Sequence, residues 1–215
     1  HDRSCATSTN GAAFSNFLST AGGTGAVPVR WSFVTIDGDL YGANSRRDPI
    51  LRYDGTTLSY PTGPPAGTIL ALTEDRLVVS GTSANPNRLA YSQSGTYTNF
   101  TTGVNSTDPW TDDIGSPGDT NTALKYSRGR LFVFKRRSIT ACLVADQYTT
   151  RCTVLSDNIG TLDPNSIVEA PDGLYFVSTE GAYWKITEAG LELISQKISN
   201  LVRNKSIGAS RSNTQ

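Results

Sequence analysis

The chain has 215 residues, of which 19 are Lys or Arg and 19 are Asp or Glu, so its formal net charge is zero. A balanced charge removes the overall electrostatic argument for nucleic acid or an anionic membrane as the main partner. Gly, Ser, Thr and Asn are abundant and Met is absent, a composition that favours strands and turns over long helices. No run approaches the roughly 18 apolar residues that a membrane span needs, so we expect no span.

Residues 1–28 are small and polar and include a Gly-rich run at 21–25. Gly/Ser-rich runs are usually flexible connections. A phosphate-binding loop would need a strand before it, a helix after it and a Lys-Ser/Thr pair, none of which is apparent. We therefore expect residues 1–28 to form a flexible N-terminal arm.

From about residue 30 onward, short apolar runs alternate with tight turns. The run 31–36 leads into Asp37-Gly38, and the run 49–53 leads into Asp54-Gly55. Asp-Gly between apolar runs is a strong hairpin signal. Three later units repeat the same order of apolar run, tight turn, second apolar run and outer hairpin. The leucines that follow the first tight turn of the units are Leu40, Leu77, Leu131 and Leu174.

These leucines recur at intervals of roughly 40–50 residues, the period of a β-propeller blade with four strands. A single four-stranded sheet cannot cover both of its faces, whereas stacked blades cover each other. We therefore predict an all-β fold over residues 29–190, a β-propeller-like array of about four antiparallel four-stranded blades. The array is either complete or finished by other sequence or another chain. A β-sandwich or barrel is the alternative, because it also needs frequent hairpins.

Two further segments break the repeat. Residues 97–121 are rich in Asn, Thr, Asp and Pro, and we expect an insertion that forms contact loops on one face. In the tail, residues 191–215, we expect a short C-terminal helix with Ser195 as its N-cap, followed by polar residues. Its apolar face follows an i, i+4, i+7, i+8 pattern. The residues of that face are Ile194, Ile198, Leu201 and Val202.

Catalytic signatures are missing from the sequence. The only histidine is His1, so no internal imidazole is available for Ser-His-Asp or Cys-His catalysis, or for a zinc site. A glycosidase needs two carboxyl groups about 5–10 Å apart, one of them protonated. Most Asp residues fall in tight turns, where they have a local role, and Glu169 in a predicted strand is the one left over. We expect no enzyme activity, no catalytic residue and no cofactor.

Two charged clusters are candidate binding sites. The acidic residues of the insertion lack the spaced Asp pattern of a calcium loop, and we expect a solvated acidic loop without a metal. These residues are Asp108, Asp112, Asp113 and Asp119. The basic run Lys135-Arg136-Arg137 could contact phosphate, but it is more typical of a wet strand-to-strand edge.

Aromatic residues alternate in the last unit, where Tyr175, Tyr183 and Trp184 lie in predicted strands. We expect them in the core and not as a platform for sugars.

Of the three cysteines, Cys142 and Cys152 flank the predicted hairpin loop 146–150. A cross-strand disulfide would form between them in an oxidising compartment, and two semi-buried thiols are the equal alternative. Cys5 has no evident partner.

Three phrases resemble structural proteins of the virions of tailed bacteriophages. They are LALTEDRLVVSGTSANPNRLAYSQSGTYTNF at 70–100, TALKYSRGRLFVFKRRSITAC at 122–142 and IGTLDPNSIVEAPDGLYFVSTEGAYWKI at 159–186. They are β-repeat phrases and carry no catalytic signature. The similarity is to the propeller-bearing tail nozzle or hub proteins of short-tailed phages, ring components below the portal.

The resemblance implies a non-enzymatic, structural protein of the virion tail that works through protein–protein interaction as an oligomer. Its expected partners are other tail proteins and copies of itself in a ring, with nucleic acid only passing through a channel. The alternative is a glycan- or receptor-binding propeller of a tail fibre, in contact with a host-surface glycan and similar to a glycosidase propeller.

Overall fold

The computed structural model describes Ala6–Thr7, Ser15–Asn16 and residues 31–195, except positions 45, 47, 116 and 117. These residues form short strands joined by turns, with one 3₁₀ turn, η1 (Pro164–Ser166). None of the helices in the described ranges is long and apolar enough to cross a membrane. The strands are β1 (Ala6–Thr7), β2 (Ser15–Asn16), β3 (Ser32–Ile36), β4 (Asp39–Ala43), β5 (Leu51–Tyr53), β6 (Leu58–Ser59), β7 (Ile69–Leu72), β8 (Leu77–Ser80), β9 (Arg88–Tyr91), β10 (Trp110–Asp113), β11 (Asn121–Ser127), β12 (Arg130–Lys135), β13 (Ile139–Leu143), β14 (Arg151–Ser156), β15 (Val168–Ala170), β16 (Gly173–Val177), β17 (Tyr183–Thr187) and β18 (Gly190–Leu193).

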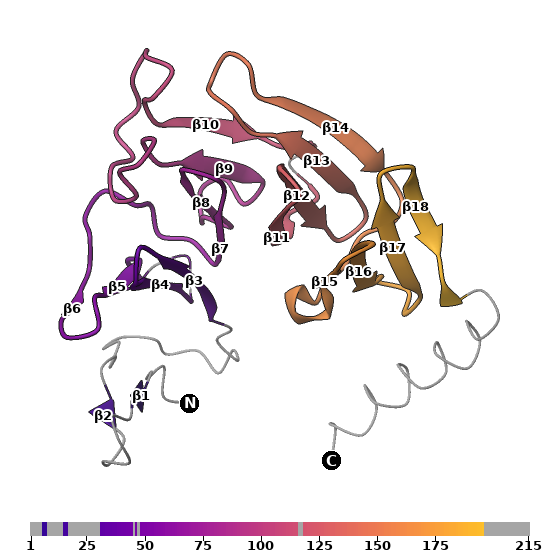
Figure 1. Cartoon of the computed structure of the whole chain (residues 1–215), viewed down its shortest axis with the longest axis horizontal. Coiled ribbons are helices and arrows are strands. Elements are labelled where there is room, and N and C mark those ends of the chain that lie inside the picture. The colour runs from indigo at the N-terminus through magenta and orange to yellow at the C-terminus, as the bar shows by residue number, and fades with distance from the viewer. Residues whose placement is uncertain are drawn as a thin grey trace.

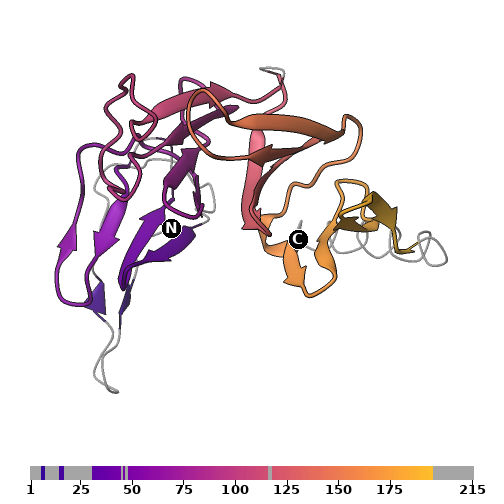
Figure 2. The same ribbon diagram turned by 45° about the horizontal axis from the view of Figure 1, so that its top comes forward.

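Four antiparallel sheets of four strands each follow one another along the chain. Sheet 1 is β3–β6, sheet 2 is β7–β10, sheet 3 is β11–β14 and sheet 4 is β15–β18. The sheets lie along an open curve, with sheets 1 and 4 at its ends, and the first strand of each sheet lies on the inner side (Figures 1 and 2). The prediction of an all-β fold with four four-stranded units is confirmed. A separate small pair, β1 with β2, lies within the segment predicted as an arm.

The tight turns have the backbone that the sequence requires. Asp37 and Gly38 both have positive φ, at 52° and 90°, and Arg128 and Gly129 have 52° and 73°. Two-residue hairpins favour such left-handed conformations because their twist matches that of the flanking strands. Each of these turns precedes the strand that carries one of the repeat leucines.

Side-chain alternation divides the apolar residues of the inner sheets between two cores. In β12, Leu131 and Val133 pack toward sheet 2, whereas Phe132 and Phe134 pack toward sheet 4. Because both faces of sheets 2 and 3 are covered, their inner strands, such as β8 and β12, read as nearly unbroken apolar runs. The core between sheets 1 and 2 contains Ile36, Tyr41, Ala43, Ile50, Leu70, Leu77 and Val79. The core between sheets 2 and 3 contains Ala71, Val78, Leu89, Tyr91, Trp110, Ile114, Leu131, Val133 and Cys142. The core between sheets 3 and 4 contains Ala123, Phe132, Phe134, Ile139, Ala141, Leu174, Phe176 and Ile186.

Polar groups join neighbouring sheets along their inner edges. The amide of Leu70 donates to Ser32 Oγ at 2.9 Å, linking sheets 2 and 1. The side-chain amide of Asn121 donates to Ser80 Oγ at 2.9 Å, linking sheets 3 and 2. Thr122 Oγ1 donates to the carbonyl of Thr161 at 2.6 Å, which ties β11 to the connection that leads into sheet 4.

The segment 97–121 contains one element that the sequence did not predict. Strand β10 pairs with β9, with Trp110 opposite Tyr91 and Asp113 opposite Arg88, and so completes sheet 2. This segment is therefore partly sheet and not a loop throughout. The fourth strand of sheet 4, β18, was also missed.

Of the predicted C-terminal helix, only Ile194 and Ser195 are described, and Ile198, Leu201 and Val202 lie outside the described residues. The predicted arm likewise lies outside them, apart from β1 and β2. Both assignments stay predictions.

Candidate functional site

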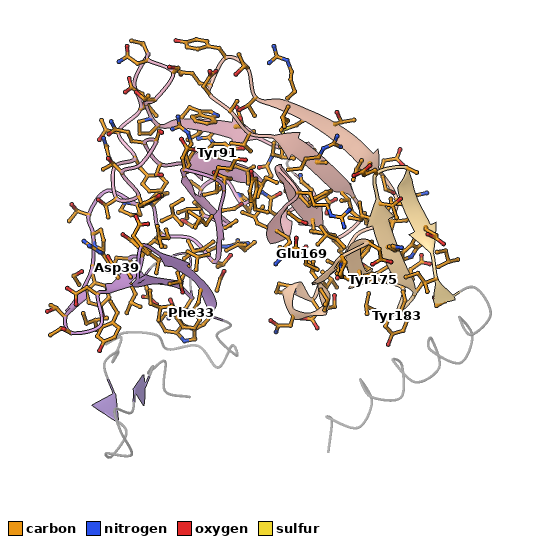
Figure 3. The ribbon with its side chains drawn as sticks, in the orientation of Figure 1. Phe33, Asp39, Tyr91, Glu169, Tyr175 and Tyr183 are labelled. Carbon is orange, nitrogen blue, oxygen red and sulfur yellow. A yellow bond between two sulfur atoms is a disulfide. The ribbon has the colours of Figure 1, made fainter. Side chains whose placement is uncertain are left out.

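Glu169 lies on β15, at the inner side of the curve, and contacts the first strand of sheet 3 (Figure 3). Ser127 Oγ donates to Glu169 Oε1 at 2.6 Å, and Lys125 Nζ lies 3.4 Å from Oε2. The hydrogen bond from Ser127 and the charge of Lys125 hold the pKa of this carboxyl below its usual value. A glycosidase acid needs a raised pKa, so this environment suits a structural link between sheets 3 and 4.

Each acidic residue of the segment 97–121 has its own protein partner. The predicted solvated cluster is therefore distributed over four local contacts. Asp108 accepts from the Asn105 amide, Asp112 from Trp110 Nε1, Asp113 from Arg88, and Asp119 from Ser138 Oγ. In the described ranges, no three His, Cys, Asp or Glu side chains are grouped so that they could hold a metal ion.

The basic run Lys135-Arg136-Arg137 is not solvent-exposed throughout, because Lys135 is 1% exposed. Its Nζ donates to the carbonyl of Ile114, and burial lowers the pKa of the ammonium. The expectation of a solvated edge is wrong for this residue, since alternation along β12 turns it inward. The next residue, Arg136, offers its carbonyl to Thr179 Oγ1 at 2.6 Å and so helps to join sheets 3 and 4.

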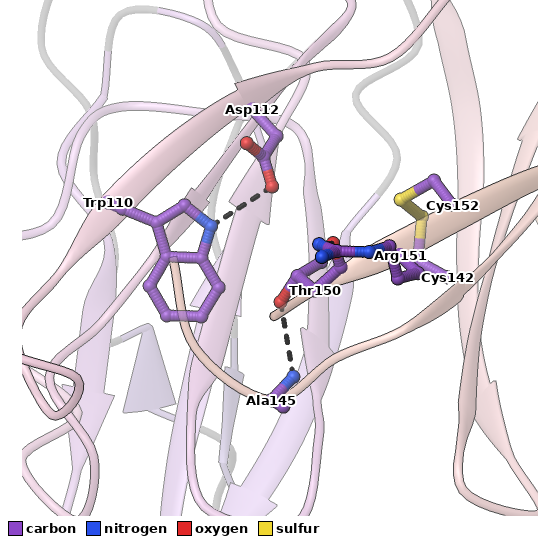
Figure 4. Close-up of a disulfide and its surroundings, with 7 residues drawn as sticks. All are labelled: Trp110, Asp112, Cys142, Ala145, Thr150, Arg151 and Cys152. Atoms are coloured by element: carbon purple, nitrogen blue, oxygen red, sulfur yellow. Dashed lines mark hydrogen bonds between the residues drawn. A yellow bond between two sulfur atoms is a disulfide. The ribbon is translucent and has the colours of Figure 1, made fainter. Parts of the chain in front are cut away.

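Cys142 and Cys152 are joined by a disulfide, with Cα atoms 4.0 Å apart (Figure 4). They are directly opposite each other on β13 and β14. Cys142 is fully buried in the core between sheets 2 and 3, while Cys152 is exposed on the outer strand. The bond fixes the outermost strand of sheet 3 to the core.

A buried arginine that the sequence did not single out organises the outer side of sheet 2. The Arg76 side chain is 2% exposed, and its Nη1 donates to the carbonyls of Ser92, Thr107 and Asp108 at 2.7, 3.2 and 3.2 Å. Nη2 donates to the carbonyl of Ser106 at 2.8 Å. One guanidinium thus holds the loop that leads into β10.

The last unit's aromatics divide between the two faces of sheet 4. Trp184 packs against the core between sheets 3 and 4, as predicted. Tyr183 lies on the opposite face, where it pairs with Val177 and is 46% exposed; Tyr175, half-buried, lies on that same face and outside the core. The expectation of a core position is therefore wrong for Tyr183 and Tyr175, because neighbouring strand residues point to opposite faces and no described element covers this one.

The exposed face of sheet 4 has a counterpart at the other end of the curve. We call the face of each sheet that carries the repeat leucine its rear face, and the opposite face its forward face. Leu77, Leu131 and Leu174 all pack against the preceding sheet. In sheet 1, Tyr41 packs toward sheet 2, so Leu40 and Phe33 lie on the rear face, which meets no described sheet.

Exposure separates covered faces from the end faces at the register positions of Phe33 and Tyr183, whereas Leu51, also on the rear face of sheet 1, is 1% exposed. On rear faces, Leu70 is 4% exposed, whereas Phe33 at the same register position is 43% exposed. On forward faces, Ile139 is 0% exposed, whereas Tyr183 at the same register position is 46% exposed. The two open faces, the rear face of sheet 1 and the forward face of sheet 4, are the candidate functional site (Figure 3).

A pocket of about 370 Å³ opens between sheets 3 and 4. Phe132, Leu174 and Ile186 line it, together with Arg128 and Glu188. Its lining therefore combines apolar side chains with charged groups of both signs.

No family model and no curated protein matches the chain. Among solved structures, the chain is similar to the computationally designed Ika8 protein, with a TM-score of 0.44 and 8% sequence identity. The match covers 75% of this chain and 46% of that chain, so it spans less than half of the designed protein. We draw no functional conclusion from a similarity of this size.

Proposed function

We propose that the chain is a non-enzymatic structural component of a tailed-bacteriophage virion tail, similar to a nozzle or hub protein, that assembles through protein–protein contacts. The proposed assembly rests on the open apolar faces at both ends of the series of sheets. Phe33, Tyr183 and Val168 are 43%, 46% and 57% exposed on these faces. Contiguous exposed apolar surface in a folded domain is typical of a protein interaction site.

The virion part of the proposal rests on the resemblance of the phrases at 70–100, 122–142 and 159–186 to phage tail proteins. In this proposal the four sheets are blades of a propeller-like array. Its partners are other tail proteins and copies of the chain in a ring, and nucleic acid only passes through the channel.

The non-enzymatic part is supported by the carboxylates. Glu169 is held in its ionised form by Ser127 and Lys125. Asp113 is paired with Arg88, whose hydrogen bond lowers the pKa of its carboxyl. An acid–base pair needs one carboxyl group that keeps its proton, and the contacts of Glu169 and Asp113 favour the charged form.

The decisive experiment looks for the chain in particles. Phage particles from the source culture are purified on a density gradient, analysed by mass spectrometry and labelled with an antibody raised against the purified chain. We expect peptides of the chain in the particle fraction and antibody at the tail. Absence from purified particles would overturn the proposal.

A second candidate is a glycan-binding propeller domain of a tail fibre, favoured by the pocket between sheets 3 and 4. A glycan array and a panel of chromogenic glycosides test it with the purified chain. Specific binding that is lost when Arg128 or Glu188 is replaced by Ala, together with label at the fibre tips, would favour this candidate.

A further inference from the structure

We propose that the forward face of sheet 4 binds the rear face of sheet 1 in a second copy of this chain, so that copies join head to tail. The inference rests on the proposed function, in that it names one partner of the assembling protein. It follows from a face-to-face packing of sheets that the chain repeats three times.

In each core, a residue at the third strand of one sheet lies in the same cluster as a residue at the first strand of the next sheet. Ile50 and Leu70 share the core between sheets 1 and 2. Leu89 and Leu124 belong to the core between sheets 2 and 3, and Ile139 and Ile167 belong to the core between sheets 3 and 4. In every pair the first residue belongs to a forward face and the second to a rear face.

The strand register identifies the residues of the end sheets that correspond to these forward and rear residues. Among forward residues, Leu89 pairs with Ser80, Ile139 with Phe134 and Tyr183 with Val177, and each partner lies three positions after the repeat leucine of its sheet. Among rear residues, Leu70 pairs with Val79, Leu124 with Val133 and Phe33 with Gly42, and each partner lies two positions after the repeat leucine of its sheet. Among the described residues, Tyr183 is therefore a forward residue without a rear partner, and Phe33 is a rear residue without a forward partner.

The exposed fractions agree with an unfilled fourth contact. Ile50, Leu89 and Ile139 are all 0% exposed, whereas Tyr183 is 46% exposed. Around Tyr183, Lys185 is neutralised by Asp172, with Nζ 2.7 Å from Oδ2, so this ion pair adds no net charge to the face. The face can therefore be covered by an apolar surface without leaving that lysine unpaired.

A second copy fits because the chain carries both halves of the contact. Forward and rear faces differ, so the contact is heterologous, and heterologous contacts close into rings when the rotation allows. Two copies bring together two sets of four sheets, and the total lies within the 4 to 8 blades of known propellers.

The first test is the mass of the chain in solution. Sedimentation equilibrium of the full chain is expected to show association beyond the 23.0 kDa monomer. Tyr183→Asp and Phe33→Asp are each expected to weaken association at least tenfold while leaving the circular dichroism spectrum unchanged. Val104→Asp, at a 77% exposed position away from both faces, is the matched control and should associate like the native chain.

The second test is a cross-link that only a head-to-tail contact can form. Phe33→Cys and Tyr183→Cys are made separately in a Cys5→Ser background, and each chain is exposed to mild oxidant alone and in a mixture. A disulfide-linked dimer is expected in the mixture and in neither single variant. The Cys142–Cys152 pair is already bonded and serves as an internal reference.

A strict monomer, or a dimer cross-linked equally well in one variant alone, overturns the head-to-tail contact. If the chain is nevertheless found in purified tails, the proposed function stands and its open faces bind a different tail protein. If the copies associate but the chain is absent from particles, the virion assignment fails and the contact stands.

Discussion

The guanidinium of Arg76 lies 4.6 Å from the ring centre of Trp110, which in turn stacks on Tyr91 with ring centres 4.2 Å apart. Arg76 comes from the turn between β7 and β8, Trp110 from β10 and Tyr91 from β9. The stack therefore ties this turn to the two outer strands of sheet 2. A cation over an aromatic ring gains most where water is excluded, and Arg76 is buried.

Replacing Arg76 by Ala should destabilise the fold strongly. The change leaves the carbonyls of Ser92 and Ser106 without their donor, and buried acceptors that lose a charged partner are costly. We expect a loss of about 3 kcal/mol in the free energy of unfolding, measured by urea denaturation. Arg76→Lys should recover only part of it, because an ammonium cannot span the same carbonyls. Arg137→Ala, at an exposed position, should stay within about 0.5 kcal/mol; an equally mild Arg76→Ala would contradict the role of the clamp.

Replacing Tyr91 by Phe should raise stability slightly. The Tyr91 hydroxyl is buried and has no hydrogen-bond partner in the described part of the chain, so its removal relieves a desolvation cost of up to about 1 kcal/mol. Burial also raises the pKa of Tyr91. The native chain should therefore lose stability as the pH rises above about 10, where the unfolded tyrosine ionises, and Tyr91→Phe should lose less.

Tyr53→Phe is the comparison for that variant. The Tyr53 hydroxyl donates to the carbonyl of Gly55 at 2.7 Å, so the same deletion should lower stability, by about 0.5 kcal/mol. Equal effects of both substitutions in thermal unfolding would argue against an unsatisfied Tyr91 hydroxyl.

Glu169 should make a small contribution to stability that acid removes. Its pKa is lowered in the folded state, so the contribution is present above the unfolded value and disappears as the pH falls through the folded pKa. The side chain is 43% exposed, so solvent screening keeps the effect below about 1 kcal/mol. Glu169→Gln should be less stable than the native chain at pH 7, and the two should converge between about pH 5 and pH 3. Glu180→Gln controls for the loss of one negative charge; a difference that persists at low pH would count against this account.

Reduction of the Cys142–Cys152 disulfide should cost about 2–3 kcal/mol, because the bond closes a short loop in the unfolded chain. Chemical unfolding with and without reductant measures the difference, and Cys142→Ser with Cys152→Ser should match the reduced chain. Thiol titration in denaturant should find one free thiol before reduction and three afterwards, since the chain has three cysteines. Three free thiols without reductant would show that the bond does not form.

The strands with strong local signals were predictable. Asp37-Gly38 marks a hairpin because both positions need positive φ, and the apolar runs around Leu77 and Leu131 mark strands buried on two faces. The runs of β10 and β18 were missed because they are short outer strands, where polar residues such as Asp112 and Glu192 are tolerated and alternation is weak.

The candidate site was less predictable, for a different reason. Alternation shows that Tyr183 and Trp184 point to opposite faces, but the sequence does not say which face another sheet covers. Arg76 follows Asp75 in a turn and reads as a surface residue. Its carbonyl partners at Ser106 and Asp108 come from a loop about 30 residues away, a distance that no local pattern encodes.

Every strand of the four sheets pairs with its neighbour in sequence, and this has a consequence for how the molecule opens and refolds. Contacts that are local in sequence form quickly, and a series of units that touch only their neighbours unfolds from its ends. Backbone amides of β8 and β12, which lie between two cores, should exchange slowest with deuterium, and those of β6 and β18 fastest. The partner surfaces therefore belong to the two end sheets, which open before the inner sheets, and binding should slow the exchange of these end sheets first.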